Sequence, residues 1–230
     1  MIKILVTGFG AFPGVPANPA SALLFALNKT SRRRLRRLGI ALELRDLAVT
    51  YGGLSPRLAA LAKEIAPDAI LQFGVALRRK AISVEMLARN RANILHPDAS
   101  GAPAPTGVVA ARGPSTLTSR IPAAEIVAAL RRQGIAGEAS RNAGDYICNA
   151  SFYSALGLAN VPCVGFIHIP RPRRRLPLRR GFPHHSNSDK NPRLDDMRRA
   201  AEIALIVIAR AVRRRRLAAS HAASSFLPEP

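Results

Sequence analysis

The chain has 230 residues, of which 48% are hydrophobic and 21% charged. This composition is that of a globular protein and excludes a disordered or collagen-like chain, and the length allows one α/β domain or at most two small ones. The charge is unusual, because 35 Lys and Arg face only 14 Asp and Glu, which gives a formal net charge of +21.

The apolar segments and the cysteines indicate in which cellular compartment the protein resides. No apolar run approaches the roughly 18 residues that a membrane span requires, and the first one reaches Gly8 too soon for a signal peptide. The two cysteines, Cys148 and Cys163, are too few for a disulfide framework and suit a reducing environment. We therefore expect a cytoplasmic protein without a membrane span.

Apolar, β-branched runs alternate along the chain with segments that carry apolar residues at helical spacing. The predicted strands cover residues 2–6, 41–47, 69–73, 136–140 and 161–169. The predicted helices cover residues 20–27, 55–65, 121–132, 146–158 and 194–212. Their ends carry the usual signals, such as Asn18 and Pro19 before the first helix and Pro67 after the second.

Strands that alternate with such helices are typical of a parallel sheet with helices on both faces. We predict one α/β domain over residues 1–216, a three-layer α/β/α sandwich around a mostly parallel, twisted sheet. Residues 97–114 and 170–192 are expected to be loops, and residues 32–37 an Arg-rich link. The small and polar residues 217–230 predict a disordered tail.

Arginine supplies most of the positive charge, with 30 Arg against five Lys. The arginines form short runs, such as residues 32–34, 173–175 and 213–216, between apolar segments or at the end of one. Only 5% of the residues are aromatic and none is Trp, which argues against a nucleic-acid interface. A solvated basic surface is the simplest interpretation, and an anionic partner such as nucleic acid or membrane headgroups is the alternative.

The dinucleotide-binding and metal-binding patterns do not fit this chain. Gly8 and Gly10 follow a strand, but Pro13 stands where the dinucleotide fingerprint needs a third Gly. His184 and His185 are adjacent, without a Cys or further His at ligand spacing, and are interpreted as surface residues. These patterns therefore indicate neither a dinucleotide site nor a metal site. The loop after the first strand still matters, because α/β sheets bind ligands at the carboxyl ends of their strands.

Three residues together match the needs of acyl transfer, which uses a nucleophile, a base and a carboxylate that orients the base. Gly144 and Asp145 mark the start of a helix, so Cys148 lies in its first turn, where the helix dipole favours the thiolate. His168 ends the last predicted strand, and Glu85 comes just after the third. On spacing alone, a single Cys near an apolar helix is more often a core residue.

The sequences around these residues belong to a longer ordered set. The stretches are Ile4-Leu5-Val6-Thr7-Gly8-Phe9-x-x-Phe12-x-Gly14 with Asn18-Pro19; Gly74, Arg79 and Ala81-Ile82-Ser83-Val84-Glu85-x-x-Ala88-x-Asn90; Pro97-Asp98 with Gly101 and Gly113-Pro114-Ser115; Ser140-x-x-Ala143-Gly144-x-Tyr146-x-Cys148-Asn149-x-x-Phe152-Tyr153; and Gly165-Phe166-Ile167-His168-Ile169-Pro170. Over roughly residues 2–170, and in outline over the final helix, the chain resembles the pyroglutamyl peptidase I (pyrrolidone-carboxylate peptidase) family of cysteine peptidases. Several motifs in one order are far more specific than any one of them.

The resemblance implies that Cys148 is the nucleophile, that His168 is the general base and then the acid, and that Glu85 stabilises the imidazolium. It implies removal of N-terminal pyroglutamyl (5-oxoproline) residues from peptides through a thioester acyl-enzyme, without a metal or cofactor. It also implies an α/β/α domain that often forms a homotetramer. Phe9 and Phe12 match the aromatic walls of the family's substrate pocket, which suit a neutral lactam ring; anchoring of the loop to the core is their other interpretation.

The chain departs from the family pattern near the expected site. Arg78 stands where a glycine is common, Met86 where an arginine is common, and Leu95 where an arginine is thought to assist the site. The segment after Pro170 is rich in Arg rather than apolar and acidic. Because loss of one transition-state donor costs on the order of 10²–10³ in rate, the alternative is a catalytically weakened or inactive relative whose basic surface binds an anionic partner.

Overall fold

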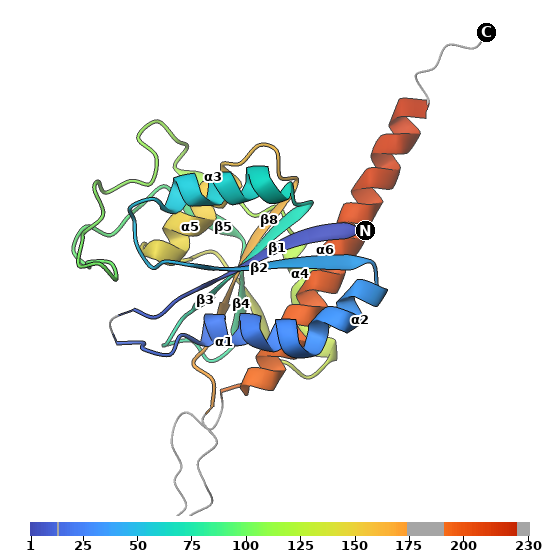
Figure 1. The fold of residues 1–230 in the computed structure, drawn as a ribbon, viewed down its shortest axis with the longest axis horizontal. Coiled ribbons are helices and arrows are strands. Elements are labelled where there is room, and N and C mark those ends of the chain that lie inside the picture. Colours follow the sequence, from blue (N-terminus) through green and yellow to red (C-terminus); the bar gives the residue numbers. More distant parts are fainter. Residues whose placement is uncertain (13, 174–190, 225–230) are drawn as a thin grey trace, which may run out of the picture.

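The computed structural model describes residues 1–12, 14–173 and 191–224 of the chain. Its helices and strands build three layers, in which a central sheet lies between two layers of helices (Figure 1). The predicted three-layer α/β/α arrangement is therefore confirmed.

The central sheet is mostly parallel, as expected. In spatial order its strands are β2 (Ile40–Leu47), β1 (Ile2–Phe9), β3 (Ala69–Val75), β8 (Cys163–Ile169), β4 (Ile82–Glu85) and β7 (Gly137–Ser140). Strands β2, β1, β3 and β8 are parallel, β4 is antiparallel to β8, and β7 is parallel to β4. A short antiparallel pair, β5 (Leu87–Arg89) and β6 (Thr116–Thr118), forms a second sheet.

Helices cover both faces of the central sheet (Figure 1). Helices α3 (Leu54–Ile65) and α5 (Ile147–Leu156) pack on one face, and α1 (Pro19–Ala26), α4 (Ala123–Arg132) and α6 (Leu194–Ser224) on the other. Helix α1 continues through a π-helical turn, Leu27–Ser31, into α2 (Arg32–Arg37). The sheet thus has a hydrophobic core on each side.

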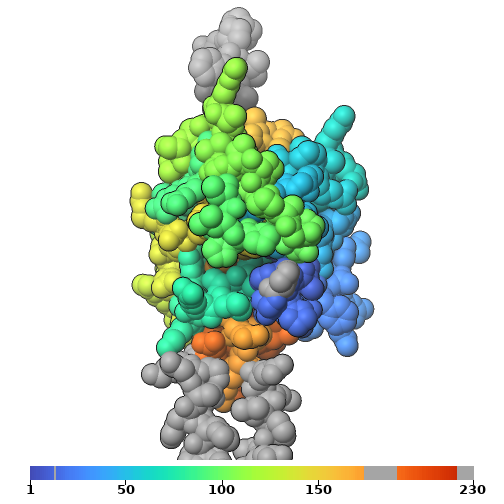
Figure 2. All heavy atoms as spheres, turned by 90° about the vertical axis from the view of Figure 1, so that its left-hand side faces the viewer, coloured from blue at the N-terminus to red at the C-terminus, as the bar shows by residue number. Residues whose placement is uncertain are grey.

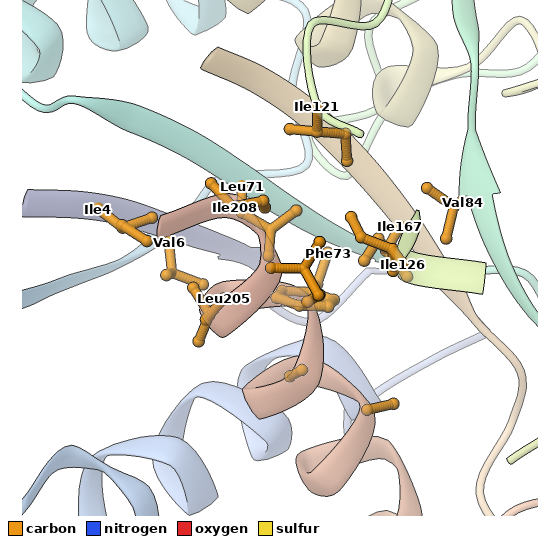
Figure 3. Packing of buried hydrophobic residues seen from close by; sticks show 14 of the residues in the cluster. Ile4, Val6, Leu71, Phe73, Val84, Ile121, Ile126, Ile167, Leu205 and Ile208 are labelled. Atoms are coloured by element: carbon orange, nitrogen blue, oxygen red, sulfur yellow. The ribbon is translucent and has the colours of Figure 1, made fainter. Parts of the chain in front are cut away.

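Alternation along the strands assigns each side chain to one of these two cores. Val6 and Phe73 point toward α6 and pack near Leu205, and Figure 3 shows this cluster from close by. Leu5 is adjacent to Val6, and Ile70 lies three residues before Phe73. Both point to the opposite face and are buried against α3 and α5. Full burial of one such side chain contributes about 1.5–3 kcal/mol, so the two cores fix the strand register firmly.

Two segments are more helical than the sequence suggested. Residues 32–37, predicted as a link, form α2, and its Leu35 is fully buried. Helix α6, predicted to end at Val212, continues to Ser224, so the prediction of a disordered tail from residue 217 is wrong for residues 217–224. Arg, Ala and Leu are strong helix formers, and these residues prolong the helix for that reason. Residues 225–230 lie outside the described residues.

The strands β4, β5 and β6 are missing from the sequence-based prediction. They have four, three and three residues, too few to establish a periodic pattern. As a result Glu85, expected in a segment just after the third strand, is instead the last residue of β4. This antiparallel strand places Glu85 beside β8.

The arginine run 213–216 anchors the C-terminal part of α6 to the body of the protein. Arg213 donates a hydrogen bond to the carbonyl oxygen of Leu38 (2.5 Å), and Arg215 donates one to that of Pro162 (2.8 Å). Arg215 also donates to the carbonyl oxygen of Arg120 (3.1 Å), and Arg214 and Arg216 form ion pairs with Glu125 and Asp68. Leu38, Pro162 and Asp68 each lie just before a strand of the sheet, so the run binds the amino ends of parallel strands. These four residues are therefore structural contacts.

Arg120 performs a similar role at the end of α5. Its guanidinium donates to the carbonyl oxygens of Leu156 (2.7 Å), Leu158 (3.0 Å) and Val161 (3.0 Å). A cation is favourable at a helix C-terminus, where carbonyl groups lack intrahelical partners. Arg120 thus closes α5 at the end opposite to Cys148.

No helix in the described part of the chain combines the length and the apolar character needed to cross a membrane. Within the same residues, no three His, Cys, Asp or Glu side chains are grouped as metal ligands would be. His184 and His185, considered above as surface residues, lie outside the described ranges, as do the arginines between residues 174 and 190.

Candidate active site

The three candidate catalytic residues come from three elements and meet on one face of the sheet. His168 is the last residue but one of β8, Glu85 ends β4, and Cys148 is the second residue of α5. Phe166, two residues before His168, is buried in the core beneath α3 and α5. Because residues two apart on a strand point to the same side, His168 faces the helix that carries Cys148.

Glu85 and His168 form a buried hydrogen-bonded pair. In the antiparallel register of β4 and β8, Glu85 lies opposite Phe166, so His168 is its diagonal neighbour on the same face. Nδ1 of His168 lies 2.7 Å from Oε1 of Glu85. The two residues are 5% and 0% exposed, so water cannot compete for this bond.

Gly74 brings the thiol close to the imidazole. Gly74 on β3 pairs in register with His168 on β8. A Cβ atom on Gly74 would lie only 2.7 Å from Sγ of Cys148, so the sulfur atom rests directly against this glycine. The thiol and the imidazole are therefore neighbours of the same residue, and a larger side chain there would displace the sulfur.

The surroundings of the pair set its protonation state. Burial acts to raise the pKa of Glu85, but the hydrogen bond and charge of His168, with help from Ser140 and Arg79, hold that pKa below its usual value. Burial lowers the pKa of His168, and Arg79 lowers it further, while Glu85 acts in the opposite direction. At neutral pH the pair is therefore a carboxylate and a neutral imidazole.

The effect of the helix dipole, which favours the Cys148 thiolate, is opposed by burial in the protein without substrate. Burial raises the pKa of the Cys148 thiol to about 12, and the negative charge of Glu85 acts in the same direction. The backbone N–H of Cys148 and the charge of Arg79 lower that pKa, but by less. Desolvation outweighs the dipole here, so the resting sulfur carries its proton.

Phe9 and Phe12 both lie at the thiol. They line a small cavity of about 50 Å³ that also contacts Cys148, Tyr146 and Ile147. The remaining lining residues are Asn18, Val49 and Val75. The cavity is thus mostly apolar and has the catalytic candidate on its wall.

A larger groove adjoins this cavity and shares Phe12 and Tyr146 with it. The groove has a volume of about 480 Å³, and its other lining residues are Asn93, His96, Pro97 and Asp145. Its walls are held together by hydrogen bonds from Tyr146 Oη to the Pro97 carbonyl (2.8 Å) and from Asn93 Nδ2 to Asp145 Oδ1 (3.1 Å). Figure 2 views this end of the molecule, where the segment around residue 100 (green) lies beside the N-terminal loop (dark blue).

Two residues of the matched motifs have contacts that sequence reasoning did not assign. Asn149, fully buried, accepts a hydrogen bond from the Arg89 N–H (2.9 Å) and donates to the carbonyls of Arg89 and Arg91 (both 2.8 Å), which fixes the start of α5 to β5. Arg79 donates to Glu85 Oε1 (2.6 Å) and to the carbonyl of Asn142 (2.6 Å). In the sequence, the position of Asn149 and Arg79 inside the matched motifs is the feature that could have pointed to them.

Three departures from the family pattern, Arg78, Met86 and Leu95, lie on the surface. Leu95 is 82% exposed, and Arg78 and Met86 are also exposed. The Leu95 side chain therefore points into solvent, away from the buried pair of Glu85 and His168.

Comparisons with known proteins agree with the geometry. A family model described as pyroglutamyl peptidase matches residues 2–187. The pyrrolidone-carboxylate peptidase of Thermococcus kodakarensis is 32% identical over 215 residues, which cover 90% of this chain and 96% of that protein. The enzyme of the same name from Cupriavidus pinatubonensis is 33% identical over 176 residues, which cover 74% and 79%.

Solved structures give the same result for the fold. The pyrrolidone carboxyl peptidase of Thermus thermophilus matches with a TM-score of 0.73 and 34% identity, over 89% of this chain and 99% of that one. The protein of the same name from Thermococcus litoralis matches with a TM-score of 0.81 and 25% identity, over 93% and 96%. On the extent of the family match and the near-complete coverage of these relatives, the chain belongs to the pyroglutamyl peptidase family.

Proposed function

We propose that this protein is a cysteine peptidase that removes N-terminal pyroglutamyl residues from peptides, with Cys148 as nucleophile. The assignment of residues rests on one observation in a member of this family. The Cys148 sulfur lies against Gly74, and Gly74 pairs with His168, which is hydrogen-bonded to Glu85. The reaction requires neither a metal nor a cofactor.

The His168–Glu85 bond selects the tautomer that a base needs. An ionised Glu85 can only accept a hydrogen bond, so Nδ1 of His168 carries the proton of the 2.7 Å contact. Nε2 is then unprotonated and able to take a proton from the Cys148 thiol. Because the resting thiol is neutral, this transfer accompanies attack on the substrate.

Acylation forms one bond and breaks another. Sγ attacks the pyroglutamyl carbonyl carbon as the thiol proton moves to His168, and the carbonyl oxygen becomes an oxyanion. The backbone N–H groups in the first turn of α5, which begins at Ile147, have no intrahelical acceptors and stabilise this charge. The imidazolium then gives its proton to the departing amine, and a thioester remains.

Deacylation repeats these steps with water. His168 takes a proton from a water molecule, which attacks the thioester, and then returns the proton to the Cys148 sulfur. Pyroglutamate leaves and the neutral thiol is restored. Glu85 stabilises the imidazolium in both halves of the reaction.

The small cavity determines which N-terminus is accepted. Its aromatic walls, Phe9 and Phe12, suit a neutral five-membered lactam. An N-terminal Gln has nearly the same composition but carries an α-ammonium group, whose desolvation between two phenyl rings is unfavourable. We therefore expect cleavage after pyroglutamate and none after an unblocked Gln.

The adjoining groove receives the rest of the peptide. Because the groove shares Phe12 and Tyr146 with the cavity, a substrate whose ring fills the cavity extends past Cys148 into the groove. A volume of about 480 Å³ holds one or more residues of the leaving peptide. The two connected spaces match an exopeptidase that accepts one terminal residue.

A fluorogenic pyroglutamyl amide and the corresponding glutaminyl amide test this function. The wild-type protein should release the fluorophore from the first substrate only, and Cys148→Ala should abolish release. Cys163→Ala is the matched control, because Cys163 is the other free cysteine and is buried in β8. Equal rates in wild type and Cys148→Ala, or no release by wild type, would contradict the proposal.

Two finer expectations accompany this function as proposals. We expect the location to be cytoplasmic and the working form to be a homo-oligomer, a tetramer by family resemblance. Two unpaired cysteines, one of them the proposed nucleophile, fit a reducing compartment. Light scattering coupled to size-exclusion chromatography measures the oligomeric state.

A further inference from the structure

We propose that Arg79 is a positioning residue of this active site, which ties the carboxylate of Glu85 to the loop that leads into Cys148. The base and the nucleophile come from different elements, and Arg79 is a direct side-chain link between them. This inference rests on the proposed function, because it assigns roles to the same Cys148 and His168.

The position of Arg79 makes the link possible. It lies in the segment between β3 and β4, where its backbone N–H donates to the Ala76 carbonyl at 3.0 Å and closes a turn. One guanidinium nitrogen, Nη1, lies 2.6 Å from Glu85 Oε1, and the other, Nη2, lies 2.6 Å from the Asn142 carbonyl oxygen. The planar fork of the guanidinium thus holds two acceptors from separate segments at once.

The second acceptor belongs to a fixed loop. The Oδ1 atom of Asn142 accepts hydrogen bonds from the N–H of Gly144 and from Arg89, both at 3.1 Å. Asn142 lies six residues before Cys148, and α5 begins at Ile147. Arg79 therefore connects Glu85 to a hydrogen-bonded loop that leads into α5 and Cys148.

The first acceptor is shared with the base. Oε1 of Glu85 accepts both from Arg79 (2.6 Å) and from His168 Nδ1 (2.7 Å). Without Arg79 the Glu85 side chain would lose one of the hydrogen bonds that hold this oxygen in place. Geometry within about 0.5 Å matters for catalysis, so we expect the loss to act on kcat rather than on substrate binding.

Arg79 also places a positive charge near His168 and Cys148. The charged groups that act on His168 are Glu85 from β4 and Arg79 from the β3–β4 segment. The same two groups act on Cys148 of α5, and Tyr146 also lies near the sulfur. Among these, Arg79 lowers the pKa of both His168 and Cys148, although burial has the larger effect on each. Removing the cation should therefore move both titrations to higher pH.

Two substitutions separate the charge from the link. Arg79→Met removes both, whereas Arg79→Lys keeps the charge but cannot span two acceptors with a planar fork. Arg78→Met is the matched control, because Arg78 is the exposed neighbour. For each variant we would measure kcat and KM on a pyroglutamyl amide across pH, and the pH dependence of iodoacetamide labelling at Cys148 by mass spectrometry.

We expect Arg79→Met to lower kcat by about 10²-fold with KM within about threefold of wild type, since misplacement by 1 Å has that effect. The acid limb of kcat/KM and the midpoint of labelling should both move to higher pH. Arg79→Lys should return both to their wild-type pH without restoring kcat, and Arg78→Met should behave as wild type.

Wild-type kcat and an unmoved labelling midpoint in Arg79→Met would overturn the inference. So would full restoration of kcat by Arg79→Lys, because charge alone would then suffice. The labelling experiment needs no turnover, so the two proposals can fail separately. If the proposed function is wrong, wild type is labelled at Cys148 but cleaves no substrate. If the role of Arg79 is wrong, the labelling midpoint of Arg79→Met stays at that of wild type.

Discussion

Gly74→Ala perturbs the proposed nucleophile, Cys148, without altering any reacting group. The new Cβ would lie 2.7 Å from Cys148 Sγ and 2.7 Å from Phe166 Cζ. Non-bonded carbon atoms pack best at about 3.5–4.0 Å, and sulfur is larger than carbon. The sulfur and the ring must therefore each move by roughly 1 Å or more relative to β3.

Two effects of different size follow from this movement. Overpacking of a core costs about 1–3 kcal/mol. In a chain of this length, Tm falls by about 2–4 °C for each kcal/mol. Displacement of the sulfur by 1 Å costs about 10²-fold in rate. Gly74→Ala should therefore remain folded at 25 °C and lose most of its kcat.

Steady-state kinetics on a pyroglutamyl amide, with thermal unfolding of the same samples, separates these effects. Gly165→Ala is the first control, because its Cβ would overlap Ile121, away from the thiol, and should lower Tm while sparing kcat. Gly107→Ala is the second, because nothing lies within 4 Å of its Cβ, and it should leave both quantities unchanged. Wild-type kcat in Gly74→Ala, or an equal loss of kcat in Gly165→Ala, would show that Gly74 does not position the Cys148 sulfur.

Three further outcomes are expected. Glu85→Gln should lower kcat about 10²-fold or more, and should move the acid limb of kcat/KM to lower pH because Glu85 raises the pKa of His168; a pH–rate profile checks both. Asp98→Asn should lower the free energy of unfolding at pH 7 by about 1–3 kcal/mol. Burial acts to raise the Asp98 pKa, but hydrogen bonds from Ser100, Tyr51 and Ala102 hold it below its usual value. The difference in free energy of unfolding between wild type and Asp98→Asn should therefore shrink below about pH 4, which urea unfolding at several pH values measures. Arg120→Met should lower Tm, since three carbonyl groups lose their donor, and should leave kcat per folded molecule unchanged; the opposite pattern would place Arg120 in the active site.

The fold was largely predictable because its main signals are periodic. The buried strands β1, β3 and β8 appear in the sequence as apolar runs, and α3 as an amphipathic helix. The short strand β4 carries no comparable pattern in its four residues. Its direction depends on contacts with β8 and β7, which are distant in sequence, so local reasoning could not supply it.

The residues of the candidate site could be proposed from the sequence, but their protonation states could not. The motifs pointed to Cys148, His168 and Glu85, and the structure brings these residues to one face of the sheet. The protonation state of Cys148 depends on how deeply the sulfur is buried, which is a property of packing. The contacts of Arg79 likewise depend on a loop more than sixty residues away along the chain.

The arginine contacts at the amino ends of the strands have a consequence for how this chain tolerates change. Arg213 and Arg215 bind main-chain carbonyl oxygens, which every residue possesses, so substitution of Leu38 or Pro162 would not remove the acceptor. A carbonyl group does not titrate and carries no net charge, so such anchors are less sensitive to acid and to salt than ion pairs. A protein with 14 acidic residues can therefore accumulate 30 arginines and still use several of them to hold its last helix in place.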